Sequence, residues 1–292
     1  MTLLSVEFRR RIDQLHLNSR GVFRGKFKGE RRSTNKGTGV EFADYRVYEL
    51  GNDLHHVDWN VYARLDRLFI KLFRAEEDLP VSILLDSSKS MDFGEPTKFS
   101  QAKQLAAALG YIGLAGLDRV AIHVFSNRAR PIVPPTYGKA RFLRVSKALE
   151  AVNVGGKTDM VTCLRYLMTH SHQAGAAVII SDFLDMNSYT SSLKQLLARK
   201  FDVTLIQILA DTELNPQLLG EWRLEDSETG NAKEITIDEV THADYKQRLD
   251  SHCNQLRQFC VNRGANYVRI TNQTPIEQVV LRDLQEIGFV QR

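Results

Sequence analysis

The segment VSILLDSSKS, residues 81–90, decides the fold that this sequence predicts. Its first half is a largely apolar run between Pro80 and Asp86, and such a run is typical of a strand buried on both faces. Strands of this kind occur in parallel sheets that helices cover on both sides. The polar second half follows at the carboxyl end of the strand, where open parallel sheets bind their ligands. The same segment therefore predicts a buried strand and a candidate site.

After this strand, helical and strand patterns alternate as far as residue 209. The predicted helices cover residues 98–117, 141–152, 161–172 and 192–199, and the predicted strands cover residues 119–125, 176–181 and 202–209. This alternation predicts an α/β fold with a doubly wound, mostly parallel sheet and right-handed crossovers. Further along, the pattern predicts a hairpin over residues 221–237, a helix over 243–262, a strand over 266–270 and a last helix from Pro275 to Glu286.

The part of the chain before residue 79 has a different character. Apolar residues at helical spacing predict a short amphipathic helix over residues 3–17, and the glycine-rich, cationic residues 22–39 predict a loop or hairpin. Short strands are predicted within residues 42–73. We therefore expect a basic helix with a β-rich extension over residues 1–78, and the α/β domain over residues 79–292 with a hairpin insertion near residues 220–238.

Composition and charge restrict the class of protein. The net charge is +4, and residues 1–36 hold ten Lys or Arg against three acids. Such a basic segment can contact nucleic acid, an acidic protein or anionic lipid, or it can be a solvated surface. The longest apolar run, residues 105–117, is shorter than the roughly 18 residues that span a bilayer, and no signal peptide is visible. Three cysteines without a CxxC pair predict neither a disulfide framework nor a thiolate metal site. We expect a cytoplasmic protein without a membrane span.

Five oxygen-bearing side chains form a candidate metal site. They are Asp86, Ser88 and Ser90 in the D-x-S-x-S segment, Thr158 before a predicted helix, and Asp182 after a predicted strand. Carboxylate and hydroxyl oxygens are hard ligands that suit Mg²⁺ or Mn²⁺ and suit Zn²⁺ poorly. Such a set leaves a coordination position for water or for an incoming carboxylate. The alternative is that these residues only cap helices and turns.

Other motifs do not indicate catalysis. Gly156, Lys157 and Thr158 resemble the end of a phosphate-binding loop, but Ala151 stands where that loop requires glycine. The histidine pairs His55 with His56 and His170 with His172 lack the spacing of metal ligands, and no histidine is placed to activate a serine. A metal-dependent hydrolase is a weaker alternative, because two-metal hydrolysis usually needs more carboxylate or histidine ligands.

The D-x-S-x-S segment with the later threonine and aspartate resembles the metal-ion-dependent adhesion site of von Willebrand factor A domains. Residues 37–73, the segment ILLDSSKSM and the segment GEWRLEDSETG are similar to the uncharacterised-domain family numbered fifty-eight, whose members typically occur beside MoxR-type AAA+ ATPases. The resemblance implies a von Willebrand factor A-like fold with a β-rich N-terminal extension.

The same resemblance implies a non-catalytic interaction module. It would bind Mg²⁺ or Mn²⁺, contact an acidic residue of a protein partner, and act as an adaptor or chaperone-like partner of a MoxR-type AAA+ ATPase. The alternative function is binding of nucleic acid or another acidic surface through the basic residues 9–36.

Overall fold

The computed structural model describes residues 3–19, 40–49, 54, 57–75, 79–171, 173–184, 189–228 and 230–292. The chain divides into two compact units, one made of residues 1–24 and 79–292 and the other of residues 25–78. The predicted loop or hairpin at residues 22–39 lies outside the described residues, as do His55, His56 and His172.

A six-stranded sheet forms the centre of the larger unit. Its strand order is β11-β8-β7-β4-β5-β6. The strands are β4 (Pro80–Asp86), β5 (Arg119–Phe125), β6 (Ala129–Thr136), β7 (Ala176–Ser181), β8 (Asp202–Leu209) and β11 (Asn266–Thr271). Neighbouring strands are parallel except β5 and β6, which are antiparallel. The predicted doubly wound, mostly parallel sheet is confirmed.

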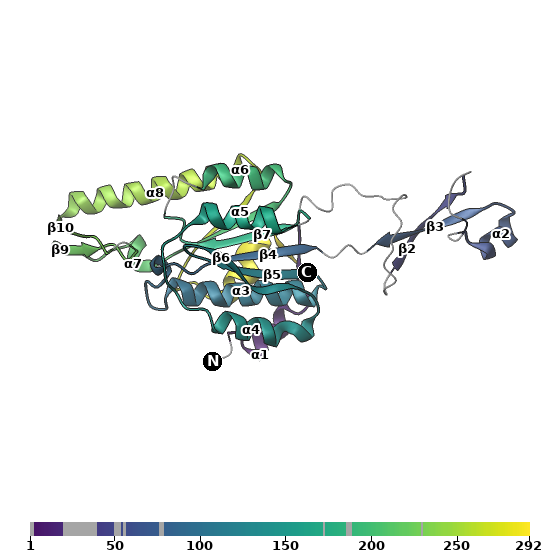
Figure 1. The fold of residues 1–292 in the computed structure, drawn as a ribbon, viewed down its shortest axis with the longest axis horizontal. Helices are drawn as coiled ribbons and strands as arrows, with labels where there is room; N and C mark the ends of the chain where they lie inside the picture. The colour runs from purple at the N-terminus through teal and green to yellow at the C-terminus, as the bar shows by residue number, and fades with distance from the viewer. Residues whose placement is uncertain are drawn as a thin grey trace. The chain divides into compact units, whose positions relative to one another are not determined.

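Helices cover both faces of this sheet (Figure 1). One apolar cluster joins a face of the sheet to α3 (Lys98–Ala115) and α4 (Phe142–Glu150). The second cluster joins the other face to α5 (Met160–His170), α6 (Thr190–Ala198) and the end of α8 (Glu239–Val261). Glycine lets α3 lie close to the sheet: a Cβ atom on Gly113 would meet Val120 Cγ2 at 2.7 Å.

The N-terminal helix α1 (Val6–Ile12) belongs to the larger unit. Phe8 and Ile12 are buried in the same cluster as the residues of α3. The short strand β1 (His16–Leu17) pairs antiparallel with β12 (Val290–Gln291) near the end of the chain. The expected division at residue 78 therefore differs from the structure, because the apolar face of this helix packs on the α/β domain.

The predicted hairpin is present as β9 (Gly220–Glu225) and β10 (Ala232–Ile237), which pair antiparallel and form a sheet of their own. Every residue of β9 is exposed. The short helix α7 (Asp211–Leu214) precedes the hairpin, and the 23-residue helix α8 follows it. The buried residues of α8 begin at Leu249, so its first turns project from the sheet beside the hairpin (Figure 1).

The smaller unit contains the antiparallel pair β2 (Val40–Val47) and β3 (Phe69–Ala75), in line with the predicted short strands. It also contains α2 (Trp59–Leu65), in which the backbone amides of Asn60 and Val61 donate to Asp58 Oδ1. Across the described ranges of both units, no helix has the length and apolar character needed to cross a bilayer.

The final predicted helix is also observed. Residues 276–286 are helical throughout, as α9 (Ile276–Gln278), a π-helical turn (Val279–Asp283) and α10 (Leu284–Glu286). Val279, Val280 and Leu284 bury its apolar side in the first cluster.

Candidate metal centre

The candidate metal centre lies at the carboxyl ends of β4 and β7. Asp86 is the last residue of β4, and Asp182 directly follows β7. We call residues 86–90 the serine loop and residues 155–159 the threonine loop. Backbone hydrogen bonds join the two loops, because Gly155 N donates to Ser87 O at 2.8 Å and Lys89 N donates to Gly156 O at 3.1 Å. The structure thus brings the first two predicted groups of ligands to one edge of the sheet.

Asp86 is fully buried at this edge. Its Oδ1 accepts a hydrogen bond from Ser88 N at 2.9 Å, and its Oδ2 accepts one from Ser181 Oγ at 2.6 Å. Burial, and next the negative charge of Asp182, raise the pKa of Asp86 to about 7, although the bonds from Ser181 and Ser88 oppose this rise. A cation beside these two carboxylates would offset their repulsion.

The two serine hydroxyls lie side by side. Ser88 Oγ and Ser90 Oγ are 3.0 Å apart, with Ser88 buried and Ser90 half-buried. Ser88 precedes the 3₁₀ helix Lys89–Met91, yet its side chain makes no capping hydrogen bond there. Capping therefore does not account for the Ser88 hydroxyl, whereas the bond from Ser88 N to Asp86 is an ordinary aspartate turn.

Thr158 is half-buried and is likewise not a helix cap. The cap of α5 is the next residue, Asp159, whose Oδ1 accepts from Thr162 N at 2.9 Å. Thr158 instead donates to Glu228 Oε1 in the turn of the β9–β10 hairpin, from its Oγ1 at 2.8 Å and from its backbone N at 3.2 Å. The predicted ligand therefore faces a carboxylate from a distant part of the chain.

Asp182 is paired with a buried lysine. Lys98 Nζ donates to Asp182 Oδ2 at 2.9 Å and to Glu213 Oε1 at 2.7 Å, and the lysine side chain is fully buried. Burial alone would lower the pKa of Lys98, but the charges of Asp182 and Glu213 outweigh it and raise the pKa. Lys98 is thus a permanent positive charge that neutralises part of this edge.

The chemistry of the donor set fits a hard divalent cation. Two carboxylates and three hydroxyls supply only oxygen, which Mg²⁺ and Mn²⁺ prefer. Within the described ranges, no three His, Cys, Asp or Glu side chains cluster closely enough to hold a metal by themselves. Any cation bound here would therefore depend on the hydroxyls and on further ligands from water or a carboxylate.

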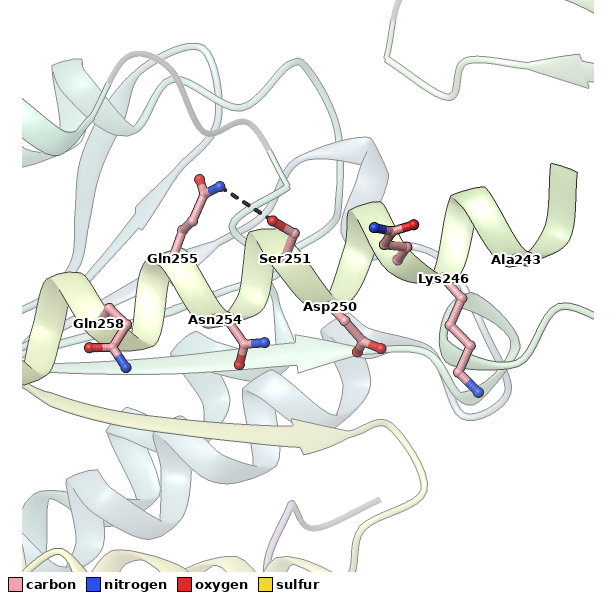
Figure 2. A pocket seen from close by; sticks show the side chains of 8 residues that line it. Ala243, Lys246, Asp250, Ser251, Asn254, Gln255 and Gln258 are labelled. Atoms are coloured by element: carbon pink, nitrogen blue, oxygen red, sulfur yellow. Dashed lines mark hydrogen bonds between the residues drawn. The ribbon is translucent and has the colours of Figure 1, made fainter. Parts of the chain in front are cut away.

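A hollow surface along α8 is separate from this set of residues. It has a volume of about 780 Å³, and all its lining residues come from that one helix. Figure 2 shows polar side chains such as Lys246, Asp250 and Asn254 spread along the helix face. A single helix encloses no ligand, so this surface is not a candidate site.

A family model described as "Protein of unknown function DUF58" matches residues 44–255. The chain belongs to the DUF58 family. The matched residues include the second half of β2, all of β3, the serine and threonine loops and the β9–β10 hairpin.

Other proteins are similar over much of the chain. An uncharacterised protein of Mycobacterium tuberculosis is 27% identical over 243 residues, which cover 82% of this chain and 76% of the relative. Among solved structures, the conserved hypothetical protein BatB from Bacteroides thetaiotaomicron aligns with a TM-score of 0.46 and 15% identity, over 72% of this chain and 98% of BatB. Manganese-loaded TRAP protein from Plasmodium vivax aligns with a TM-score of 0.37 and 17% identity, over 45% of this chain and 57% of TRAP.

Three residues of this edge are not among the predicted ligands: Lys98, Glu213 and Glu228. A signal existed for Lys98, because a lysine in the first turn of a helix opposes the helix dipole and usually has a specific partner. No comparable local signal existed for Glu213 and Glu228, since their partners lie 115 and 70 residues away in the sequence.

Proposed function

We propose that this protein is a non-catalytic interaction module that binds Mg²⁺ or Mn²⁺ and uses the cation to hold an acidic side chain of a protein partner. The ligands would be Asp86, Ser88, Ser90, Thr158 and Asp182. The observation that carries this proposal is the buried Asp86 carboxylate, whose pKa is raised to about 7 next to Ser88, a hydroxyl that makes no capping hydrogen bond.

The charge balance supports an open cation site. Asp86, Asp182 and Glu213 together supply three negative charges, and the buried Lys98 supplies one positive charge against Asp182 and Glu213. The two negative charges that remain attract a divalent cation, which in turn attracts a further carboxylate to a coordination position that the protein leaves open. Mg²⁺ dehydrates reluctantly and usually keeps several waters, one of which an incoming carboxylate can replace.

The side chains around the site also support a binding role without catalysis. Serine hydroxyls next to the ligands are already engaged, since Ser87 Oγ donates to Phe125 O and Ser181 Oγ donates to Asp86. A nucleophile needs a general base within hydrogen-bond reach. Within the described residues, no His or Cys side chain forms a hydrogen bond with the serine loop.

We further propose that the partner is a MoxR-type AAA+ ATPase and that the protein acts in the cytoplasm. The resemblance of residues 37–73 to the ATPase-associated family supports the partner. The cytoplasm is supported by the cysteines Cys163, Cys253 and Cys260, which are all buried and unpaired as expected in a reducing compartment.

Capture of the ATPase tests this function. The immobilised protein is expected to retain a purified MoxR-type ATPase in Mg²⁺ and to release it into EDTA, and Asp86→Asn is expected to retain none. Asp202→Asn is the matched control, because it neutralises another buried aspartate. Asp202 is the first residue of β8 and therefore lies at the edge of the sheet opposite to the candidate metal centre. Capture that persists in EDTA would contradict the proposal.

The alternative, binding of nucleic acid through residues 9–36, stays a prediction. Of its basic residues, only Arg9, Arg10 and Arg11 lie within the described residues, and Arg9 packs over the Phe142 ring at 5.8 Å. Binding that falls steeply with salt and is indifferent to EDTA would favour this alternative.

A further inference from the structure

The β9–β10 hairpin places a carboxylate on the candidate metal centre. Glu228 Oε1 accepts two hydrogen bonds from Thr158, at 2.8 Å from Oγ1 and at 3.2 Å from the backbone N. Glu228 is half-buried, although the strands that carry it are almost entirely exposed. A side chain at the tip of an exposed hairpin is buried in this way only because the tip reaches back to the threonine loop.

The hairpin turn holds Glu228 in this orientation. Asp226 Oδ1 accepts from Glu228 N at 3.0 Å, and Asp226 also pairs through its backbone with Gly230 and Asn231 at 2.8 Å each. Gly230 has a φ of +72°, a conformation that glycine adopts without strain. The turn therefore presents Glu228 through its own local bonds and does not depend on a neighbouring molecule.

One oxygen of Glu228 is left for a cation. Both hydrogen bonds from Thr158 go to Oε1, and within the described part of the chain Oε2 accepts none. Thr158 is itself one of the five residues proposed to hold the cation. The Glu228 carboxylate, bonded to Thr158, therefore lies at the place where the acidic side chain of a partner would have to enter.

We propose that Glu228 is an internal acidic ligand of the cation site, which fills the open coordination position until the carboxylate of a partner replaces it. This inference rests on the proposed function, because it needs a cation at Asp86, Ser88 and Ser90. It adds a ligand residue and a mode of regulation: the hairpin competes with acidic partners for one position.

The hairpin can move away from the candidate metal centre without disturbing the core. It forms a two-stranded sheet separate from the six-stranded sheet (Figure 1). All residues of β9 are exposed. The buried residues of α8, from Leu249 onward, anchor its far end and leave its first turns free of the core. Displacement of Glu228 therefore breaks the two bonds to Thr158 and no strand pairing of the main sheet.

Binding of Mn²⁺ to the full-length protein, followed by water-proton relaxation, tests this inference. Glu228→Gln keeps an oxygen that can accept both bonds from Thr158 but removes the charge. It is expected to weaken Mn²⁺ binding about tenfold, since ligand charge sets the affinity of such sites. The relaxivity of the bound Mn²⁺ should rise, because a water replaces the carboxylate. Acetate should lower that relaxivity in Glu228→Gln and leave wild type unchanged.

The controls separate this inference from the proposed function. Glu221→Gln removes a charge from the exposed strand β9 and should behave as wild type. If Mn²⁺ binds wild type and Glu228→Gln with equal affinity, relaxivity and response to acetate, Glu228 only anchors the hairpin and the inference is wrong. If neither protein binds Mn²⁺, the proposed function itself fails and the inference fails with it.

Discussion

Lys98 determines how the carboxylates at the strand ends are balanced. Its ammonium group is fully buried between Asp182 and Glu213, at 2.9 and 2.7 Å. The buried carboxylates of Asp86 and Asp182 repel one another. The positive charge of Lys98 offsets that repulsion whether or not a cation is bound. The site therefore does not require metal in order to fold, although it retains enough negative charge to attract one.

Replacement of Lys98 by methionine is expected to destabilise the protein by about 3–5 kcal/mol, because it leaves the buried Asp182 without its partner. Addition of Mg²⁺ should restore part of this loss. Urea unfolding with and without Mg²⁺ measures both effects. Lys103→Met on the same helix is the control, since Lys103 lies over the Phe99 ring at 4.9 Å and is not part of the site. Equal stability of Lys98→Met and wild type would contradict this account of the charge balance.

His123 on β5 should make the protein less stable in mild acid. The side chain is 9% exposed, and burial, with a smaller contribution from the charge of His170, lowers its pKa from 6.5 to about 4. The folded protein keeps His123 neutral, so the stability it contributes is present above pH 6.5 and is lost as the pH falls toward 4.

The loss attributable to His123 should reach at most about 3 kcal/mol. It should be absent in His123→Phe, whose ring can still pack against Tyr166, which lies 5.5 Å from His123 between ring centroids. Urea unfolding of both proteins between pH 4 and pH 7.5 measures the difference. Parallel pH profiles of wild type and variant would show that His123 is not the cause.

At the scale of elements, helix α1 acts as part of the α/β domain. Phe8 is 3% exposed within the core cluster, and Ser5 caps the helix by accepting from Phe8 N at 3.0 Å. The basic residues of this segment suggest a separate arm, but the apolar spacing of the same helix predicts a buried face. Burial of that face outweighs the solvation of its arginines: Arg10 and Arg11 remain exposed, whereas Arg9 is half-buried over the Phe142 ring.

Phe8→Ala is therefore expected to lower the free energy of unfolding of the whole larger unit by about 3–5 kcal/mol. Val6→Ala, at a residue that is 59% exposed on the same helix, should change it by less than about 0.5 kcal/mol. Guanidinium unfolding followed by circular dichroism compares the two. Unfolding of Phe8→Ala at the wild-type midpoint would mean that α1 is an appendage.

The sequence predicted those elements whose pattern is local. The buried strand at residues 81–85 and the glycine-spaced helix after it both follow from periodicity alone. Strand β6 was missed because its segment ARPIVPPT contains three prolines, which sheets tolerate only at an edge such as the one β6 occupies. Helix α2 was also missed, since its seven residues are rich in aromatic and branched side chains that favour strands.

The candidate site was predictable to a similar degree. Position after a strand was enough to place Asp86 and Asp182 at one edge, because parallel strands end together. The contacts of Lys98 and Glu228 depend on how distant loops fold over that edge, and no local pattern contains this information. The prediction of five ligands therefore did not include the charged neighbours Lys98, Glu213 and Glu228.

At the scale of the whole molecule, the larger unit carries the candidate site and the hairpin that reaches it. Cation binding should stabilise this unit as a whole, because the ligands come from β4, from the threonine loop and from the residue after β7. Ligand binding to the folded state adds about 2.7 kcal/mol at a concentration of 100 times Kd.

A calorimetric titration of the full-length protein with Mg²⁺ and Mn²⁺, with the melting temperature followed in parallel, tests the central claim most directly. The account predicts one site in wild type and in Asp202→Asn, a melting temperature that rises by several degrees, and no binding in Asp86→Asn. The metal-free Asp86→Asn protein should be at least as stable as wild type, because it lacks a buried charge. Binding of equal affinity in Asp86→Asn, or no binding in any of the three proteins, would contradict the account.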